Sequence, residues 1–430
     1  MQRTRPLSLC LTCLVLCLPF TLLAAESNQE WEKQARAYLK SIQYTREQLE
    51  DWISGGASLG EAYDGRLGWL FADRRVKHGV DGSISTYRYS GARRTIMYGD
   101  NPCRINTYGD SFTHCDQVSD GETWQEVLAA HLCEPLRNFG VGGYSVYQAY
   151  LRMKREETRT PAPYIIFNIY DDDHYRNLHG WRNIRLGYTT GMWPAVVGST
   201  MPYVEANPAT GHFAEFGNPC PTPESVYKLS DLGWVFQRFK DDFVLKLVLA
   251  QRHADSNSPQ ASYDLLETLA REHGLQVSID SPEKLLETTQ NLYTRAALFA
   301  SMRIVEKIDQ FASAQEKRLL FVLSYGERRT AQALRTGIRF DQEFLDFLEA
   351  KRLPYVDLVE AHRRDFAQFK LSVDEYIDRY WISHYNPRGN FFQAFAIKDS
   401  LVELLDPRPA SYSTDLSSYI EMKPRTSQEK

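Results

Sequence analysis

Short apolar runs along the chain alternate with longer stretches in which apolar residues recur every three or four positions. The short runs are typical of strands covered on both faces of a sheet, and they span residues 104–108, 136–139, 164–170, 318–326 and 355–358. The helical stretches that follow them span residues 124–128, 146–155, 236–316, 340–351 and 391–405. Because strands that alternate with helices pair in parallel through right-handed crossovers, this order predicts an α/β fold with a mostly parallel sheet.

The chain has further parts on either side of this repeat and within it. Residues 26–102 start with a charged helical pattern over 27–55 and continue as turns and small strands, expected to pack on a main domain over 103–410. An insertion at about residues 178–316 interrupts that domain. Its first part, 178–235, is rich in Gly, Pro and aromatic residues, and we expect it to wall a substrate cleft, because long irregular stretches are usually functional. Residues 411–430 are polar and predict a flexible tail.

The first 25 residues predict export. Arg3 and Arg5 precede an apolar run over residues 7–25 that ends in Ala24 and Ala25. A basic start, an apolar core and small residues at the end are typical of a secretory signal peptide, so we predict cleavage near Ala25 and a secreted or periplasmic protein. The run is also near the length of a membrane span, which leaves an uncleaved anchor as the alternative.

Charge and cysteine content narrow the possible partners. The chain has 55 Asp and Glu against 50 Lys and Arg, a formal net charge of −5, and it lacks the basic patch that nucleic-acid binding requires.

Four cysteines follow the predicted signal peptide: Cys103, Cys115, Cys133 and Cys220. In an oxidising compartment they are able to form two disulfides, one of them across the turn between Cys103 and Cys115, or else they are small buried residues. Their spacing matches no zinc pattern, and we expect no metal and no cofactor.

A candidate nucleophile lies where the first predicted strand ends. Residues 104–108 lead into Gly109-Asp110-Ser111, and a helical pattern follows. In an open α/β sheet, a serine in such a turn is presented at the carboxyl end of the strand, where these sheets bind their ligands. The same three residues also suit an ordinary turn with a helix cap, so the functional interpretation depends on partners elsewhere in the chain.

The next two strand ends carry further candidate groups. The glycine-rich turn over residues 138–143 lets a ligand approach the backbone, so the amide of Gly143 is a candidate donor to an anionic oxygen. The strand over 164–170 ends in Asp171, Asp172 and Asp173, and His174 follows. Three acids at a strand end suit a bound cation, a base that needs orienting, or sugar hydroxyls, whereas a solvated acidic loop is the alternative without a function.

His384 is the candidate general base. It lies in a loop before the last predicted helix, as Ser111 lies before its own. Imidazole is the side chain that accepts a proton from serine near neutral pH. Ser111 and His384 therefore form a nucleophile and base pair if the fold brings them together.

The order of these blocks resembles that of the SGNH (GDSL-type) hydrolase family. Gly109-Asp110-Ser111 matches its first block, residues 138–143 its second, and residues 384–389 its last. The resemblance covers about residues 103–175 and 318–405. It implies a flavodoxin-like three-layer α/β/α fold, a serine nucleophile with a histidine base, and the amides of Ser111 and Gly143 as oxyanion donors.

Two positions depart from the family's pattern. Where the third block has an Asn that donates to the oxyanion, this chain has Asp172, which donates only if it holds a proton. The acid three residues before the histidine is replaced by Trp381, and Asp378 is the nearest upstream acid, which makes it a candidate to orient His384. A dyad helped by a backbone carbonyl is the alternative. We expect Asp172 and His174 to line the site as substrate-binding residues.

The resemblance implies a secreted serine esterase that removes or transfers a small acyl group, most often on a carbohydrate. The expected partner is a small-molecule or glycan ester, with no nucleic acid, and with membrane contact only if the N-terminal segment stays uncleaved. Two alternatives remain open. One is a glycan-binding protein on a degenerate hydrolase scaffold, and the other is a membrane-anchored polysaccharide O-acyltransferase.

Overall fold

Five neighbouring parallel strands form the larger part of the main sheet, which confirms the predicted α/β fold. We describe the protein from a computed structural model that covers residues 18–54, 61–71, 75–77, 82–88, 91–187, 200–252 and 260–412. The parallel strands are β6 (Ile105–Tyr108), β7 (Leu136–Asn138), β8 (Tyr164–Tyr170), β11 (Arg318–Ser324) and β12 (Tyr355–Asp357). Their order across the sheet, β12-β11-β8-β6-β7, is that of flavodoxin-like folds, in which the direction of winding switches between β6 and β8.

Antiparallel strands from the N-terminal segment extend this sheet beyond β7. They are β5 (Ala92–Arg93), β4 (Ile84–Arg88) and β3 (Arg75–Lys77). The boundary predicted between residues 102 and 103 therefore falls within the sheet. A separate hairpin of β1 (Glu61–Asp64) and β2 (Gly68–Phe71) comes from the same segment.

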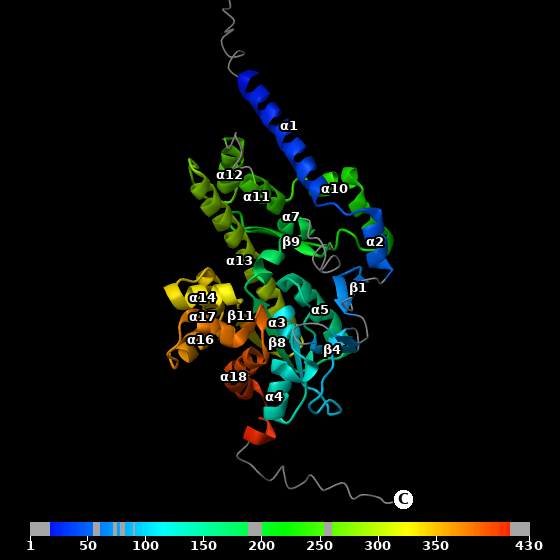
Figure 1. The fold of residues 1–430 in the computed structure, drawn as a ribbon, viewed down its shortest axis with the longest axis vertical. Coiled ribbons are helices and arrows are strands. Elements are labelled where there is room, and N and C mark those ends of the chain that lie inside the picture. The colour runs from blue at the N-terminus through cyan, green and yellow to red at the C-terminus, as the bar shows by residue number, and fades with distance from the viewer. Residues whose placement is uncertain are drawn as a thin grey trace, which may run out of the picture.

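Helices lie on both faces of the sheet, as in a three-layer fold (Figure 1). On one face α4 (Trp124–Leu132) packs on α18 (Pro387–Leu404), and on the other α5 (Val146–Arg159) packs on α13 (Pro282–Ala314). The two faces differ because α4 leads from β6 to β7, whereas α5 leads back across the sheet to β8. Right-handed connections that run in opposite directions place their helices on opposite faces.

The remaining elements near the sheet follow β8, β11 and β12. They are α6 (Asp173–Arg176), α14 (Glu327–Thr336), α15 (Gln342–Ala350), α16 (Leu358–Phe366), α17 (Val373–Tyr380), a hairpin of β13 (Trp381–Ile382) and β14 (His384–Tyr385), and the last turn η4 (Ala410–Tyr412). The turn at Ser111 and the loop after it hold α3 (Ser111–His114) and η2 (Asp120–Glu122).

The N-terminal helical pattern forms two helices, α1 (Leu18–Ser41) and α2 (Arg46–Ile53). The break comes at Thr45, because its side chain and that of Gln48 form a capping box that starts a new helix. Among the helices within the described ranges, we find none with the length and apolar character needed to cross a membrane. Most of the predicted signal peptide, residues 1–17, and most of the predicted tail, residues 413–430, lie outside the described residues.

The predicted insertion is only partly an insertion. Its last helix, α13, is 33 residues long and is the crossover between β8 and β11, so it belongs to the main fold. Figure 1 shows α13 extending away from the sheet toward α11 and α12, where a second apolar core forms. The other elements are α7 (Asn183–Leu186), β9 (Tyr203–Asn207), β10 (His212–Phe216), α9 (Pro223–Val226), η3 (Tyr227–Ser230), α10 (Leu232–Phe239), α11 (Phe243–Arg252) and α12 (Gln260–Glu272).

Two buried neighbouring strands, β8 and β11, hold the carboxyl edge of the sheet in place. Ile165, Ile166 and Phe167 of β8 are fully buried, as are Phe321 and Val322 of β11. Burial of each such side chain contributes about 1.5–3 kcal/mol. The loops that follow β6, β8 and β11 therefore start from a well-packed base.

Candidate active site

Ser111 follows β6 in a turn that requires a glycine. Gly109 has φ +151°, and a Cβ at this position would lie 2.2 Å from the side-chain oxygen of Thr113 and 2.7 Å from the carbonyl oxygen of Asn168. Asp110 then caps α3, because its carboxylate accepts the amide of Phe112. The turn places Ser111 at the carboxyl edge of the sheet, beside the switch point between β6 and β8.

The fold brings Ser111 and His384 together across 273 residues of sequence. The Ser111 Oγ lies 2.9 Å from His384 Nε2, within hydrogen-bond distance. His384 starts β14, the second strand of the hairpin before α18. The Ser111 hydroxyl also lies 3.1 Å from Asp110 Oδ2.

Gln117 orients the imidazole of His384. Its Oε1 lies 3.1 Å from His384 Nδ1 and accepts the backbone N–H of His384 at 3.0 Å and the hydroxyl of Ser383 at 3.1 Å. Because a backbone N–H faces it, the Gln117 atom at this position is the carbonyl oxygen. An oxygen there requires the ring proton on Nδ1, which leaves the lone pair of Nε2 for Ser111.

The two residues that contact His384 here, Gln117 and Ser383, both have an unusual backbone conformation. Gln117 has φ +71° and Ser383 has φ +83°. Non-glycine residues are uncommon in this left-handed region, and such residues concentrate at functional sites. The two loops thus bear a local conformational cost where they meet at His384.

Asp378, the acid predicted to orient His384, does not do so. It is exposed on α17 and, within the described part of the chain, makes no hydrogen bond or ion pair with His384. Gln117 takes that place instead. The sequence carried no signal for this residue, because it lies 267 positions before the histidine and is not an acid.

The backbone amides expected to stabilise an oxyanion are unoccupied by protein. Gly143 has φ +79°, and the indole N–H of Trp69 donates to the carbonyl of Gly142 at 3.0 Å. In a trans peptide the N–H points opposite to the carbonyl, so the Gly143 N–H points away from Trp69. Within the described ranges, no protein atom accepts the N–H of Ser111 or of Gly143. Trp69 comes from β2, and no pattern in the sequence links it to the site.

Asp172 forms ion pairs with two arginines, and this pairing argues against its holding a proton as an oxyanion donor. Its carboxylate lies 2.9 Å from Arg176 Nε and 2.7 Å from Arg185 Nη2. Burial opposes ionisation, but the two arginines hold the pKa of Asp172 well below its ordinary value. An ionised carboxylate has no proton to donate.

Arg176 links the three blocks that surround the nucleophile. Its Nη1 donates to Asp173 at 2.7 Å, to the carbonyl of Tyr144 at 3.1 Å and to Asp110 at 3.3 Å. Burial raises the pKa of both Asp110 and Asp173, which share this one buried arginine. The sequence signal was present, since Arg176 lies four positions after Asp172 in a helical turn.

His174 is not a substrate-binding residue. It is buried, its Nδ1 lies 2.8 Å from the hydroxyl of Ser301 on α13, and its ring contacts Phe344. Burial lowers the pKa of His174 to about 4, so the ring is neutral at physiological pH. The residue belongs to the packing between the sheet and α13.

The four cysteines are free thiols, so of the two alternatives the structure has the one without disulfides, with Cys115 and Cys220 buried. Cys103 lies before β6 and Cys115 after α3, which follows the other end of that strand. Cys115 Sγ lies 3.4 Å from Gln125 Oε1, and Cys103 Sγ lies 3.2 Å from the carbonyl oxygen of Pro135.

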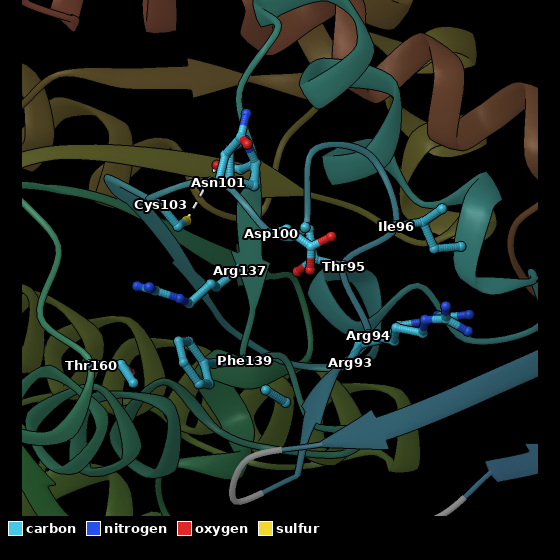
Figure 2. Close-up of a pocket in the computed structure, with 13 residues that line it drawn as sticks. Arg93, Arg94, Thr95, Ile96, Asp100, Asn101, Cys103, Arg137, Phe139 and Thr160 are labelled. Atoms are coloured by element: carbon cyan, nitrogen blue, oxygen red, sulfur yellow. Dashed lines mark hydrogen bonds between the residues drawn. The ribbon is translucent and has the colours of Figure 1, made fainter. Parts of the chain in front are cut away.

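Two cavities lie near this part of the fold. One, of about 290 Å³, contains Asp171 and Asp172 in its wall and lies at the carboxyl edge of the sheet. The other, of about 420 Å³, lies along β7 and is lined by residues that precede β6 and β7, such as Cys103 and Pro135. Figure 2 shows that Arg94 and Arg137 in the second cavity point in opposite directions, so their charges do not converge on one ligand.

Comparisons with known proteins add two similar folds. No protein-family model matches the chain, and no curated protein matches it. Among solved structures, the chain is similar to a lipolytic protein of the G-D-S-L family from Desulfitobacterium hafniense DCB-2, with 11% identity, 70% of this chain and 99% of that chain covered, and a TM-score of 0.30. It is also similar to an alpha/beta hydrolase enzyme from the metagenome of Lake Arreo, Spain, with 12% identity, coverage of 71% and 97%, and a TM-score of 0.32. The fold and the site are assigned from the geometry described above.

Proposed function

We propose that the protein is a serine ester hydrolase in which Ser111 is the nucleophile and His384 the general base. The observation that carries this proposal is the distance of 2.9 Å between Ser111 Oγ and His384 Nε2. The pair lies at the carboxyl edge of a doubly wound sheet, where such folds bind their ligands. A serine and a histidine in this geometry, with a third group on the other ring nitrogen, are typical of acyl transfer.

The proposed reaction has two steps. Ser111 Oγ attacks the ester carbonyl while His384 Nε2 takes the hydroxyl proton, and the amides of Ser111 and Gly143 donate to the oxyanion. His384 then returns the proton to the leaving alcohol, and an acyl-enzyme forms. Water activated by the same imidazole adds to the acyl group, and the Ser111 oxygen leaves with the proton.

Two features of the site predict slow turnover. Gln117 orients His384 without the negative charge that a carboxylate provides for the imidazolium. Asp172 stands where the family has a third oxyanion donor, and loss of one such donor costs about 3 kcal/mol of barrier. We expect a weaker enzyme than one with a complete set of these groups.

The finer proposal is that the substrate is a small acyl ester on a carbohydrate outside the cytoplasm. It is supported by the resemblance in the sequence blocks, by the signal-like N-terminus and by the polar cavity beside the acids. Turnover of acetylated sugars by the purified protein, compared with short acyl esters of simple alcohols, tests the substrate class.

The mechanism is tested by Ser111→Ala, His384→Ala and the double variant. Because the two groups act as one unit, each single change is expected to abolish turnover, and the double change to be little worse. Asp378→Asn is the control: it removes the acid expected from the sequence and should leave turnover unchanged. Full activity in Ser111→Ala would exclude the mechanism.

A glycan-binding protein without catalysis is the second candidate. The observation that favours it is the pair of substitutions at the site, a neutral Gln117 on His384 and an ionised Asp172 in place of a donor. A fluorophosphonate probe separates the two candidates, since it labels an activated serine only. Labelling of wild type and not of Ser111→Ala supports the hydrolase, and glycan binding without any labelling supports the alternative.

We further propose that the protein is exported with cleavage near Ala25. A mature N-terminus at Glu26, measured by intact mass of protein from the secretory compartment, is the expected result. Recovery of uncleaved chain in the membrane fraction would support the anchored acyltransferase instead.

A further inference from the structure

The cavity beside the three acids is built from both the main fold and the insertion. Its polar wall has Asp171 and Asp172 after β8 and Arg329 in the first turn of α14, with Arg185 on α7. Its apolar wall comes from α11 and includes Leu247. A volume of about 290 Å³ suits a ligand of the size of a single sugar ring.

The charges in this wall are not all satisfied by the protein. Asp172 and Arg185 pair with each other at 2.7 Å. Arg329 stacks on the ring of Phe340 at 4.4 Å, and within the described part of the chain it makes no hydrogen bond or ion pair. A guanidinium held in this way presents its donors to whatever enters the cavity.

Asp171 has one oxygen in use and one available. Its Oδ2 accepts the amide of Gly326 at 2.9 Å, which fixes the carboxyl group at the end of β8. Among the described residues, no donor contacts Oδ1, although the residue as a whole is only 7% exposed. Asp171 and Arg329 do not form an ion pair with each other, so a ligand is able to contact both.

The cavity and the nucleophile lie at the same edge of the sheet. Ser111 follows β6, Asp171 follows β8 and Arg329 follows β11, and these three strands are neighbours in the sheet. The ring of Tyr170, which precedes Asp171, stacks on that of Phe112, which follows Ser111, at 4.4 Å. A ligand in the cavity is therefore one strand away from the reacting hydroxyl.

We propose that this cavity binds a carboxylate-bearing sugar residue, of the uronic acid class, within the ester substrate. The carboxylate binds Arg329, because a planar guanidinium without a protein partner suits a two-point contact with a carboxylate. A ring hydroxyl binds Asp171 Oδ1, and the C–H face of the ring packs on the aliphatic side chains of α11. Burial raises the pKa of Asp171 to about 7, which limits the repulsion between this group and an anionic ligand below neutral pH. This inference rests on the proposed hydrolase function, since it assigns a part of its substrate.

The test is binding of sodium D-glucuronate and of D-glucose to the full chain, measured by isothermal titration calorimetry at pH 6. Wild type is expected to bind glucuronate at least tenfold more tightly than glucose, and Arg329→Gln to lose that preference. Arg328→Gln is the matched control, because Arg328 is the adjacent, exposed arginine of α14 and does not line the cavity. It should bind as wild type does.

Several results would overturn the inference. They are equal affinity for the two sugars, no binding of either sugar, the same loss in Arg328→Gln as in Arg329→Gln, or tighter binding of glycine than of glucuronate, which would indicate a zwitterion site. Glucuronate carries no ester, so the measurement does not depend on catalysis. Glucuronate binding by a wild-type protein that lacks esterase activity would leave this site standing while the hydrolase fails, and esterase activity without glucuronate binding would do the reverse.

Discussion

Gln117 Oε1 lies 3.1 Å from His384 Nδ1 and accepts the backbone N–H of the same residue at 3.0 Å. One neutral side chain therefore fixes both the ring and the backbone of the proposed base. It sets the tautomer that leaves Nε2 free to accept the Ser111 proton, and it does so without a negative charge. Gln117 therefore orients the imidazole of His384 but supplies no negative charge to stabilise the imidazolium, whereas a carboxylate at this position would do both.

This separation predicts opposite effects for two substitutions of Gln117. Gln117→Ala removes the acceptor for Nδ1, so kcat should fall about 10²-fold, with KM nearly unchanged. Gln117→Glu keeps an oxygen in place and adds charge beside the developing imidazolium, so kcat should rise above wild type. Steady-state kinetics on a short acyl ester check both, and a lower kcat in Gln117→Glu than in Gln117→Ala would contradict the assignment.

Trp69 predicts a link between the N-terminal segment and catalysis. Trp69→Phe removes the indole N–H that fixes the carbonyl of Gly142, while it keeps an aromatic ring in the core. We expect a loss of about 1–2 kcal/mol in unfolding free energy, as for a lost buried hydrogen bond, and a fall of about tenfold in kcat from a less ordered Gly143 amide. Urea unfolding and kinetics measure the two effects separately. Stability loss with unchanged kcat would show that Trp69 supports the fold alone.

The ion pairs of Asp172 are expected to stabilise the fold at every pH above the depressed pKa of this residue. Asp172→Asn removes the charge shared by Arg176 and Arg185, so the unfolding free energy should fall by about 1–3 kcal/mol, with the partial exposure of the side chain keeping it below the value for a fully buried pair. Activity should fall with it, because Arg176 also holds the Ser111 and Gly143 loops. Asp378→Asn, on the exposed face of α17, is the control. Higher activity in Asp172→Asn would restore the protonated-donor idea.

Asp171 predicts a pH dependence of stability. Burial raises its pKa to about 7 in the folded protein, against about 3.9 in an unfolded chain. Between these values the folded state binds a proton that the unfolded state lacks, so the unfolding free energy falls as pH rises from about 4 to about 7. Asp171→Asn removes this fall in the unfolding free energy. The fall amounts to no more than about 4 kcal/mol.

The variant should therefore match wild type near pH 4 and have a higher Tm above pH 7. Thermal unfolding of both proteins across this range gives the comparison. Parallel Tm profiles would show that Asp171 titrates in the folded state as it does in the unfolded chain.

The order of strands and helices was readable from the sequence because it depends on local patterning. Apolar runs such as residues 164–170 and 318–324 form β8 and β11, since a strand buried on both faces has to be apolar throughout. Ser111 and His384 were readable for a related reason. Each lies beside a strongly patterned element, Ser111 directly after β6 and His384 shortly before α18, and parallel strands bring their carboxyl ends to one edge.

The partners of these residues were decided only by the tertiary structure. Gln117 and Trp69 act through contacts that join segments far apart in the chain and leave no periodic pattern. Arg176 has a local signal in its pairing with Asp172, but its contacts with Asp110 and Tyr144 come from the fold alone. The charge state of Asp172 depends on two arginines whose positions the fold alone determines. The sequence by itself thus determined the α/β order and the two candidate reacting residues. The tertiary structure decided which groups orient these two residues and which charges surround them. Pairing and burial depend on distances between segments, and composition does not encode those distances.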